Sequence, residues 1–301
     1  MTYVIEGFTD STITVSSADG PIEIAYQTAG SGPALLLLHG FPQTKAIWRH
    51  IAPALAKRFS VVVTDLRGYG ASSKPLGAPD HSTYSKRSMA ADQHAVMQAL
   101  GHHQFSVLGH DRGGRVSHRL AMDFPDSVQR SMVLDISPTL TMYENTSMEF
   151  AKGYWHWFFL IQPHPIPETL IGANPEFWLK NHMGRHAGTG IFDSLSWAEY
   201  LAGANNPESM HAMCEDYRAA ASIDLIHDRA DRDAGKKLTM PFRVLWGDHG
   251  LVAKCFSPIE DWKRVAKDVS GKGVPCGHYI PEELPQELLA EAELFFLKEP
   301  A

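Results

Sequence analysis

The stretch FSVLGHDRGG, residues 105–114, decides the fold. It begins as a short apolar run, typical of a strand buried on both faces, and is followed by a helical pattern over 112–124. Gly109 and Gly113 allow a tight turn between the two, so that the side chain at its apex, Asp111, stands clear of the backbone as a nucleophile does. A turn whose Asp only caps the helix is the alternative.

The alternation of strands and helices extends outward from this stretch in both directions. Near-continuous Val and Leu runs predict strands at 34–40, 59–65, 105–111, 131–136 and 242–248, and period-2 alternation predicts two more at 11–17 and 22–30. Helices are predicted at 44–58, 84–100, 112–124 and 282–297. The predicted fold class is therefore α/β, a mostly parallel sheet with helices on both faces.

One long segment interrupts this pattern. Residues 138–228 contain no strand-like run, but they hold many aromatic residues and several segments of helical length. Because open α/β sheets bind ligands outside the carboxyl ends of their strands, we expect this segment to form a helical cap domain over that edge. Residues 1–137 and 229–301 would then form the core domain.

Composition narrows the class of function. The chain has 301 residues, 44% of them hydrophobic, and a formal net charge of −7, which argues against nucleic-acid binding. No apolar run approaches the roughly 20 residues of a membrane span, and the opening MTYVIEGFTD lacks the features of a signal peptide, so we expect a cytoplasmic protein without a membrane partner. The three cysteines form no CxxC pair and the sixteen histidines no HExxH motif, so no metal site is predicted.

A histidine and an acid in the expected chain order would complete a catalytic triad with Asp111. His278 follows the last strand region and precedes the final helix, where a general base that activates water is expected. Two carboxylates could orient it. Asp135 ends the strand after the nucleophile helix, and Asp248 ends the run 242–248.

These motifs resemble the dehalogenase and epoxide-hydrolase branch of the α/β-hydrolases over essentially the whole chain. The resemblance is carried by HGFP at 39–42, DLRGYGAS at 65–72, the Asp elbow and the Gly-His pair at 277–278. It implies the α/β-hydrolase fold with a helical cap, and a reaction in which the elbow carboxylate forms an ester that water later hydrolyses.

The resemblance also implies roles for further residues. In this family an acid after the later strand usually lies three residues beyond the Gly of a Trp-Gly pair, where this chain has Gly250, so Asp135 is favoured over Asp248. The oxyanion hole should use the backbone N–H of Arg112, which follows the nucleophile, and that of Phe41 in HGFP.

Two arginines begin the helix that follows Asp111. Arg112 and Arg115 lie in its first turn, where the helix macrodipole disfavours cations by roughly 0.3–1 kcal/mol each, and neither has an acidic residue four positions on. Cations at an unfavourable helix position beside a nucleophile suggest a function, and two guanidiniums could bind a substrate carboxylate. Surface arginines or a structural ion pair are the alternative.

The insertion holds two aromatic segments, YWHWFF at 154–159 and EDYR at 215–218, which could simply belong to a core. Together with the elbow HDRGGR, however, they make the chain similar to fluoroacetate dehalogenases. That resemblance implies that His156, Trp157 and Tyr217 surround a departing halide. It also implies a small anionic haloacetate as substrate and a homodimer, and the chemistry needs no metal or organic cofactor.

We therefore expect hydrolysis of fluoroacetate or a close 2-haloacid to the 2-hydroxy acid. Epoxide hydrolases share HGFP and the Asp elbow and are the first alternative, with Tyr154, Tyr200 and Tyr217 available to protonate an epoxide. A neutral epoxide gives no use for paired arginines, and the elbow of that family typically carries Trp where this chain has Arg112. A binding protein on an inactive hydrolase scaffold is the second alternative, disfavoured because the full triad is present.

Overall fold

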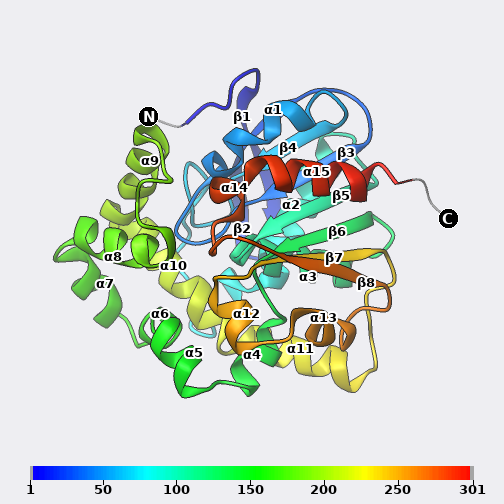
Figure 1. Cartoon of the computed structure of the whole chain (residues 1–301). Coiled ribbons are helices and arrows are strands. Elements are labelled where there is room, and N and C mark those ends of the chain that lie inside the picture. Colours follow the sequence, from blue (N-terminus) through cyan, green and yellow to red (C-terminus); the bar gives the residue numbers. More distant parts are fainter. Residues whose placement is uncertain (1–2, 299–301) are drawn as a thin grey trace.

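The computed structural model describes residues 3–298, and within them it places eight strands in one sheet (Figure 1). The strands are β1 (Thr9–Ser17), β2 (Gly20–Ala29), β3 (Ala34–Leu38), β4 (Ser60–Thr64), β5 (Phe105–His110), β6 (Val128–Leu134), β7 (Phe242–Gly247) and β8 (Val269–Val274). Their order is β1-β2-β4-β3-β5-β6-β7-β8, antiparallel from β1 to β4 and parallel across the rest. The predicted fold class is confirmed.

Helices connect the strands of the core. They are the 3-10 helices η1 (Lys45–His50) and η2 (Ser82–Tyr84) and the α-helices α1 (Ala52–Leu55), α2 (Lys86–Ala99), α3 (Arg112–Asp123), α12 (Leu251–Cys255), α13 (Pro258–Lys263), α14 (Ile280–Glu283) and α15 (Pro285–Phe296). Two predicted helices, 44–58 and 282–297, are each divided in two. Pro53 and Pro285 lie in the first turn of the second piece, because proline lacks the N–H that would continue the helix before it.

Side chains that alternate along the central strands pack into two separate cores. Leu36 and Leu38 of β3 lie in one core with residues of α2 and α3. Leu35 and Leu37 lie in the other core with residues of η1, α1 and α15. The parallel strands are therefore buried on both faces, which is why they read as continuous apolar runs.

The edge strand β8 is missing from the sequence-based prediction. Its sequence, VSGKGV, contains two glycines and no continuous apolar run. Both glycines are needed, because a Cβ on Gly271 would lie 2.2 Å from the carbonyl oxygen of Val244 and one on Gly273 would lie 1.8 Å from Oδ1 of Asp248. An edge strand that is paired on one side only does not need the apolar composition of the central strands.

Between β6 and β7 the described chain contains helices and no strand. They are α4 (Thr139–Glu144), α5 (Met148–Gly153), α6 (His156–Phe159), α7 (Ile166–Gly172), α8 (Pro175–Ala187), α9 (Ser194–Asn205), α10 (Pro207–Ala220) and α11 (Ile223–Asp233). In Figure 1, α7, α8 and α9 lie to the left of the sheet, and the predicted boundary at residue 228 falls inside α11. We call residues 138–228 the cap; its standing as a separate domain stays a prediction.

Candidate active site

Asp111 lies at the sharp turn between β5 and α3. Its backbone has φ 44° and ψ −112°, a conformation that residues with a side chain rarely adopt. A Cβ on Gly40 would lie 2.6 Å from the Cβ of Asp111. One on Gly113 would lie 2.3 Å from the carbonyl oxygen of Leu38. The two glycines therefore let β3, the turn and α3 approach closely enough to hold Asp111 at the carboxyl end of the sheet.

The carboxylate of Asp111 is buried in a polar setting. Its Oδ2 accepts a hydrogen bond from the backbone N–H of Phe41, with N and O 3.2 Å apart. Burial alone would raise the pKa of Asp111, but His278, Arg115 and Arg112 outweigh it and hold that pKa below its usual value. The side chain is therefore ionised at neutral pH, the state in which a carboxylate is nucleophilic.

His278 and Asp135 form a buried pair at the same edge of the sheet. Nδ1 of His278 lies 2.6 Å from Oδ2 of Asp135, and the other oxygen of Asp135 accepts a hydrogen bond from the N–H of Gly247 (3.0 Å). The hydroxyl of Tyr154 lies 3.3 Å from the same Nδ1. Asp248, the other predicted candidate, is exposed and lies against β8. The geometry favours Asp135 as the partner of His278.

Arg112 forms an ion pair with the cap. Its Nη2 donates to Oδ1 and to the backbone oxygen of Asp216, at 2.6 and 2.7 Å. Burial would lower the pKa of Arg112, but Asp216 raises it well above its usual value. This buried carboxylate explains how a cation is tolerated in the first turn of α3. One nitrogen of Arg112, Nη1, has no hydrogen-bond partner within residues 3–298.

Arg115 is buried as well, but its partners are neutral. It donates from Nη1 to the backbone oxygen of Ser137 (3.2 Å) and to Oγ1 of Thr139 (2.9 Å), and from Nη2 to Sδ of Met142 (3.2 Å). Its guanidinium lies 4.6 Å from the centre of the Trp157 ring. Within the described chain Nε has no partner, and no ion pair involves Arg115. The two predicted arginines therefore lie side by side with unequal partners.

The cap brings His156, Trp157 and Tyr217 together from α6 and α10. The Tyr217 ring lies 5.7 Å from the His156 ring and 6.3 Å from the Trp157 ring, centre to centre. It also lies 5.0 Å from the ring of Phe41, which ties the cap residues to the predicted oxyanion loop. The three rings are buried, so they form a compact aromatic group that faces the loop after β3.

The protonation states of this group suit hydrogen-bond donation. Burial, together with Arg185 and His182, lowers the pKa of His156 well below its usual value, so its imidazole is neutral. Burial raises the pKa of Tyr217 well above its usual value, so its hydroxyl keeps its proton. That hydroxyl is buried and has no hydrogen-bond partner in the described part of the chain. A buried donor without a partner is the arrangement expected where a ligand supplies the acceptor.

Residues 33–283 match the family model of the alpha/beta hydrolase fold. The chain belongs to the alpha/beta hydrolase family. It is 42% identical to a fluoroacetate dehalogenase of Burkholderia sp., over 94% of this chain and 92% of that protein. It is 34% identical to a soluble epoxide hydrolase of Corynebacterium sp., over 90% and 92%. A solved structure from Nostoc sp. PCC 7120 is 48% identical with a TM-score of 0.91, covering 96% of this chain and 98% of that one. The resemblance inferred from the motifs is confirmed, and the protein is a hydrolase.

The sequence-based prediction omits three charged residues that this hydrolase has near its predicted site. Asp216 contacts Lys86 as well as Arg112, and Nη1 of Arg185 lies 3.0 Å from Nδ1 of His156. Asp216 directly precedes Tyr217 in the EDYR segment, so its position was an available signal. Lys86 and Arg185 carry no such signal, because their contacts depend on how distant segments pack.

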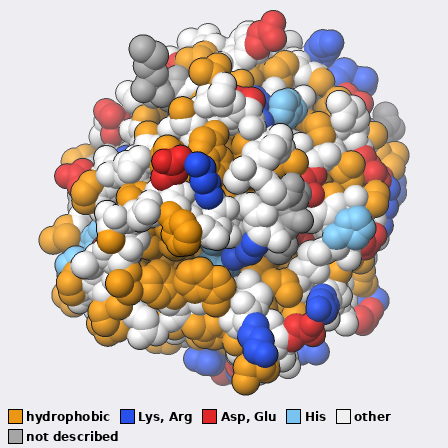
Figure 2. All heavy atoms as spheres, turned by 60° about the vertical axis from the view of Figure 1, so that its left-hand side comes forward, with side chains coloured by type: hydrophobic (Ala, Val, Ile, Leu, Met, Phe, Trp, Pro, Cys, Tyr) orange, Lys and Arg blue, Asp and Glu red, His pale blue; other side chains and the backbone are white. Residues whose placement is uncertain are grey.

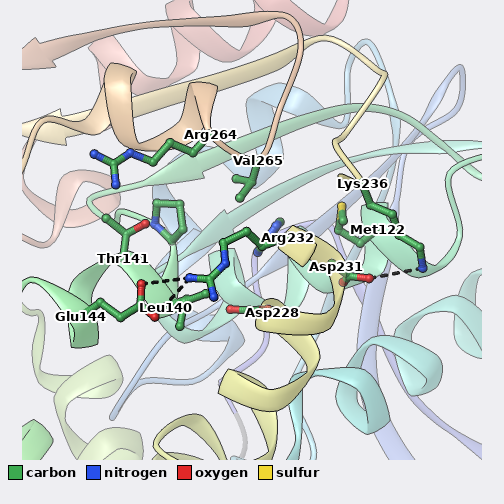
Figure 3. A pocket seen from close by; sticks show the side chains of 12 residues that line it. Met122, Leu140, Thr141, Glu144, Asp228, Asp231, Arg232, Lys236, Arg264 and Val265 are labelled. Atoms are coloured by element: carbon green, nitrogen blue, oxygen red, sulfur yellow. Dashed lines mark hydrogen bonds and ion pairs between the residues drawn. The ribbon is translucent and has the colours of Figure 1, made fainter. Parts of the chain in front are cut away.

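A cavity between α4 and α11 is a further hollow of this hydrolase (Figure 3). Its walls include Leu140 and Glu144 of α4 and Asp231 and Arg232 of α11. Glu144 and Arg232 form an ion pair there, as do Asp231 and Lys236. None of the predicted site residues lines this cavity, so it does not compete with Asp111 as the site of reaction.

Proposed function

We propose that this hydrolase displaces the halogen of fluoroacetate or a closely related 2-haloacid. The observation that carries the proposal is Arg115, a buried guanidinium whose hydrogen bonds go to neutral acceptors and whose Nε has no partner within residues 3–298. Leaving a cation buried without an anion is unfavourable. A substrate carboxylate held between Arg115 and the unpartnered Nη1 of Arg112 would satisfy both groups.

In the first half of the proposed reaction, a carboxylate oxygen of Asp111 attacks the α-carbon from the side opposite the halogen. The carbon–oxygen bond forms as the carbon–halogen bond breaks, the electron pair leaves with the halide, and an aspartyl ester remains. The halide departs toward His156, Trp157 and Tyr217. Fluoride is a poor leaving group, and N–H and O–H donors in a dry pocket stabilise its developing charge.

In the second half, His278, oriented by Asp135, takes a proton from water, and the resulting hydroxide attacks Cγ of the ester. The N–H groups of Phe41 and Arg112 hold the oxyanion. Collapse of this intermediate expels the 2-hydroxy acid, which takes the proton back from His278. The hydroxyl oxygen of the first product therefore comes from Asp111, and the oxygen of water stays in the enzyme. Neither step as written requires a metal or an organic cofactor.

Epoxide hydrolysis is the second candidate, and one observation favours it. Tyr217 has a buried hydroxyl without a partner in the described chain, and Tyr154 is buried beside His278. A tyrosine hydroxyl could protonate an opening epoxide, and an epoxide hydrolase is among the relatives at 34% identity. Tyr200, the third tyrosine considered for that role, donates to Oε1 of Glu282 at 3.0 Å. In this candidate Arg115 has no substrate anion to bind, so haloacid hydrolysis is preferred.

The deciding experiment offers fluoroacetate, chloroacetate and styrene oxide separately to the purified enzyme, with Asp111→Asn as control. We expect fluoride release that the substitution abolishes. Diol formation from styrene oxide without fluoride release would overturn the proposal and assign the epoxide reaction. Turnover of none of the three would reject both candidates for these substrates.

A homodimer, which the family resemblance implies, and a cytoplasmic location, which the sequence features predict, remain proposals. The cap offers a surface for self-association, because Ile166 and Leu170 of α7 and Phe177 of α8 are exposed. Apolar side chains gather on this side of the molecule in Figure 2. Light scattering coupled to size exclusion gives the mass in solution, and Leu170→Glu should shift it toward the monomer.

None of the helices within residues 3–298 is long and apolar enough to cross a membrane.

A further inference from the structure

We propose a divalent-metal site in the cap, with His164, Glu168 and His211 as ligands and Zn²⁺ as the ion it fits. His164 precedes α7, Glu168 lies on α7 and His211 lies on α10, helices that pack against each other in the cap (Figure 1). Sixteen histidines without a recognisable spacing led us to predict no metal ligands from the sequence. The fold brings two of them to one carboxylate, which the spacing does not reveal.

The distances from the carboxylate oxygen to the two imidazole nitrogens match a zinc site. Oε1 of Glu168 lies 3.3 Å from Nδ1 of His164 and 3.1 Å from Nδ1 of His211, and the three ligand atoms all lie within 4.8 Å of one another. Tetrahedral zinc with bonds of about 2.0–2.2 Å holds its ligand atoms about 3.3 Å apart. His164 is exposed, so the fourth position would face solvent and could be filled by water.

Hydrogen bonding accounts for only part of this arrangement. Oε1 of Glu168 accepts from Nη1 of Arg218 at 2.8 Å and lies within hydrogen-bond distance of Nδ1 of His211, at 3.1 Å. Nδ1 of His164 lies 3.3 Å from the same oxygen without forming a hydrogen bond to it. A metal ion would join all three groups, because His164 and His211 then present lone pairs instead of protons, and Arg218 orients the carboxylate from the outer shell.

The local charge also leaves room for a cation. Arg218 is shared between Glu168 and Glu215, since Nη1 lies 2.9 Å from Oε1 of Glu215, so one of these two negative charges remains uncompensated by Arg218.

A metal at this position would fasten α10 to α7. α10 also carries Asp216, the partner of Arg112, and Tyr217. None of the three proposed ligands belongs to the cluster around Asp111. We therefore assign the ion a structural role, in which it holds α10, the helix that carries the proposed halide ligand Tyr217.

The test measures zinc bound by the whole protein. Protein stripped with EDTA is dialysed against zinc chloride, and bound zinc is counted by elemental analysis for wild type, His164→Gln, His211→Gln and His81→Asn. His81 is a matched control, because its Nδ1 lies 2.7 Å from Oε2 of Glu215 on the same helix but it shares that carboxylate with no second histidine. Asn also tolerates the positive φ of 63° at that position.

We expect wild type and His81→Asn to bind one more equivalent of zinc than the two glutamine variants. Zinc at about one hundred times its Kd should raise the melting temperature of wild type and His81→Asn by about 4 °C, and should leave the glutamine variants unchanged. The melting curves without zinc show whether each variant is folded. Equal zinc in all four proteins, or none in folded wild type, overturns the proposal.

Discussion

The carboxyl edge of the sheet and the cap both supply side chains to the proposed site, but they hold them by different means. At the sheet edge, Asp111 and Asp135 have positive φ and are fixed by backbone hydrogen bonds and close glycine contacts. In the cap, His156 and Tyr217 are held by packing of rings and by the ion pair of the neighbouring Asp216. Substitutions at the sheet edge should therefore abolish the chemistry, and those in the cap should change which leaving group is tolerated.

Asp111→Asn is the substitution with the largest expected effect. The amide cannot form the ester, so kcat for fluoroacetate should fall by about 10⁴- to 10⁶-fold. The measurement is fluoride release, with an unchanged melting curve as the check that the fold is intact. A single turnover of wild type in water enriched in oxygen-18 should place the label in Asp111 and not in the released hydroxy acid. Label in that first product would show that water attacks the α-carbon directly.

His278→Gln should separate the two halves of the proposed reaction. Ester formation does not need His278, whereas ester hydrolysis loses a general base that contributes about 10²- to 10⁴-fold. We expect about one equivalent of halide to be released rapidly, followed by very slow turnover. Intact-protein mass spectrometry should then find the enzyme carrying the carboxymethyl group of the substrate as an ester. Slow halide release without a burst would mean that His278 acts before or during displacement.

At the sheet edge, the residues that the structure brings together carry local signals in the sequence. The elbow and the order of Asp111, Asp135 and His278 along the chain are local signals, because each residue follows a recognisable strand region. The partnership of Arg112 with Asp216 joins residues 104 positions apart, and no local pattern encodes it. Strand β8 was not predicted because its two glycines are required by close contacts with β7 and the residue after it, and they interrupt the apolar pattern of a strand.

Tyr217→Phe tests the contribution of the cap with the ring left in place. Removing one preorganised donor to a developing anion costs about 10²- to 10³-fold in kcat, and we expect this for fluoroacetate. Chloride and bromide depend less on hydrogen bonding as they leave, so the loss for chloroacetate and bromoacetate should be smaller. Steady-state rates for the three substrates give the comparison. An equal loss for all three would assign the hydroxyl a part in positioning the substrate.

The two arginines of α3 should respond differently to removal, because Arg112 is paired with the carboxylate of Asp216 and the hydrogen bonds of Arg115 go to neutral acceptors. Arg115→Leu removes a charged contact to the substrate carboxylate, and we expect kcat/KM to fall by about 10- to 200-fold with a smaller loss of stability than Arg112→Leu causes. Arg112→Leu leaves Asp216 with one cation fewer in a buried setting and should destabilise the fold by about 3–5 kcal/mol. Denaturant unfolding and initial rates measure both. Equal destabilisation by the two substitutions would argue against Arg115 as a cation reserved for substrate.

The smallest expected effect is that of pH on the rate of halide release. It tests whether the core or the cap sets the ionisation of Asp111. The groups that hold the pKa of Asp111 below its usual value, His278, Arg115 and Arg112, all belong to the core. A lowered pKa keeps the carboxylate ionised as pH falls, so the halide burst in rapid mixing should be constant from pH 8 to about pH 5 and decline only near or below about pH 4. The pKa of His156 is lowered as well, so the halide pocket gains no charge over that range.

Tyr217→Phe should slow the burst without moving its pH profile. A profile that already falls below pH 6 would mean that burial outweighs the core cations, and one that shifts in the cap variant would mean that the cap sets the ionisation of Asp111.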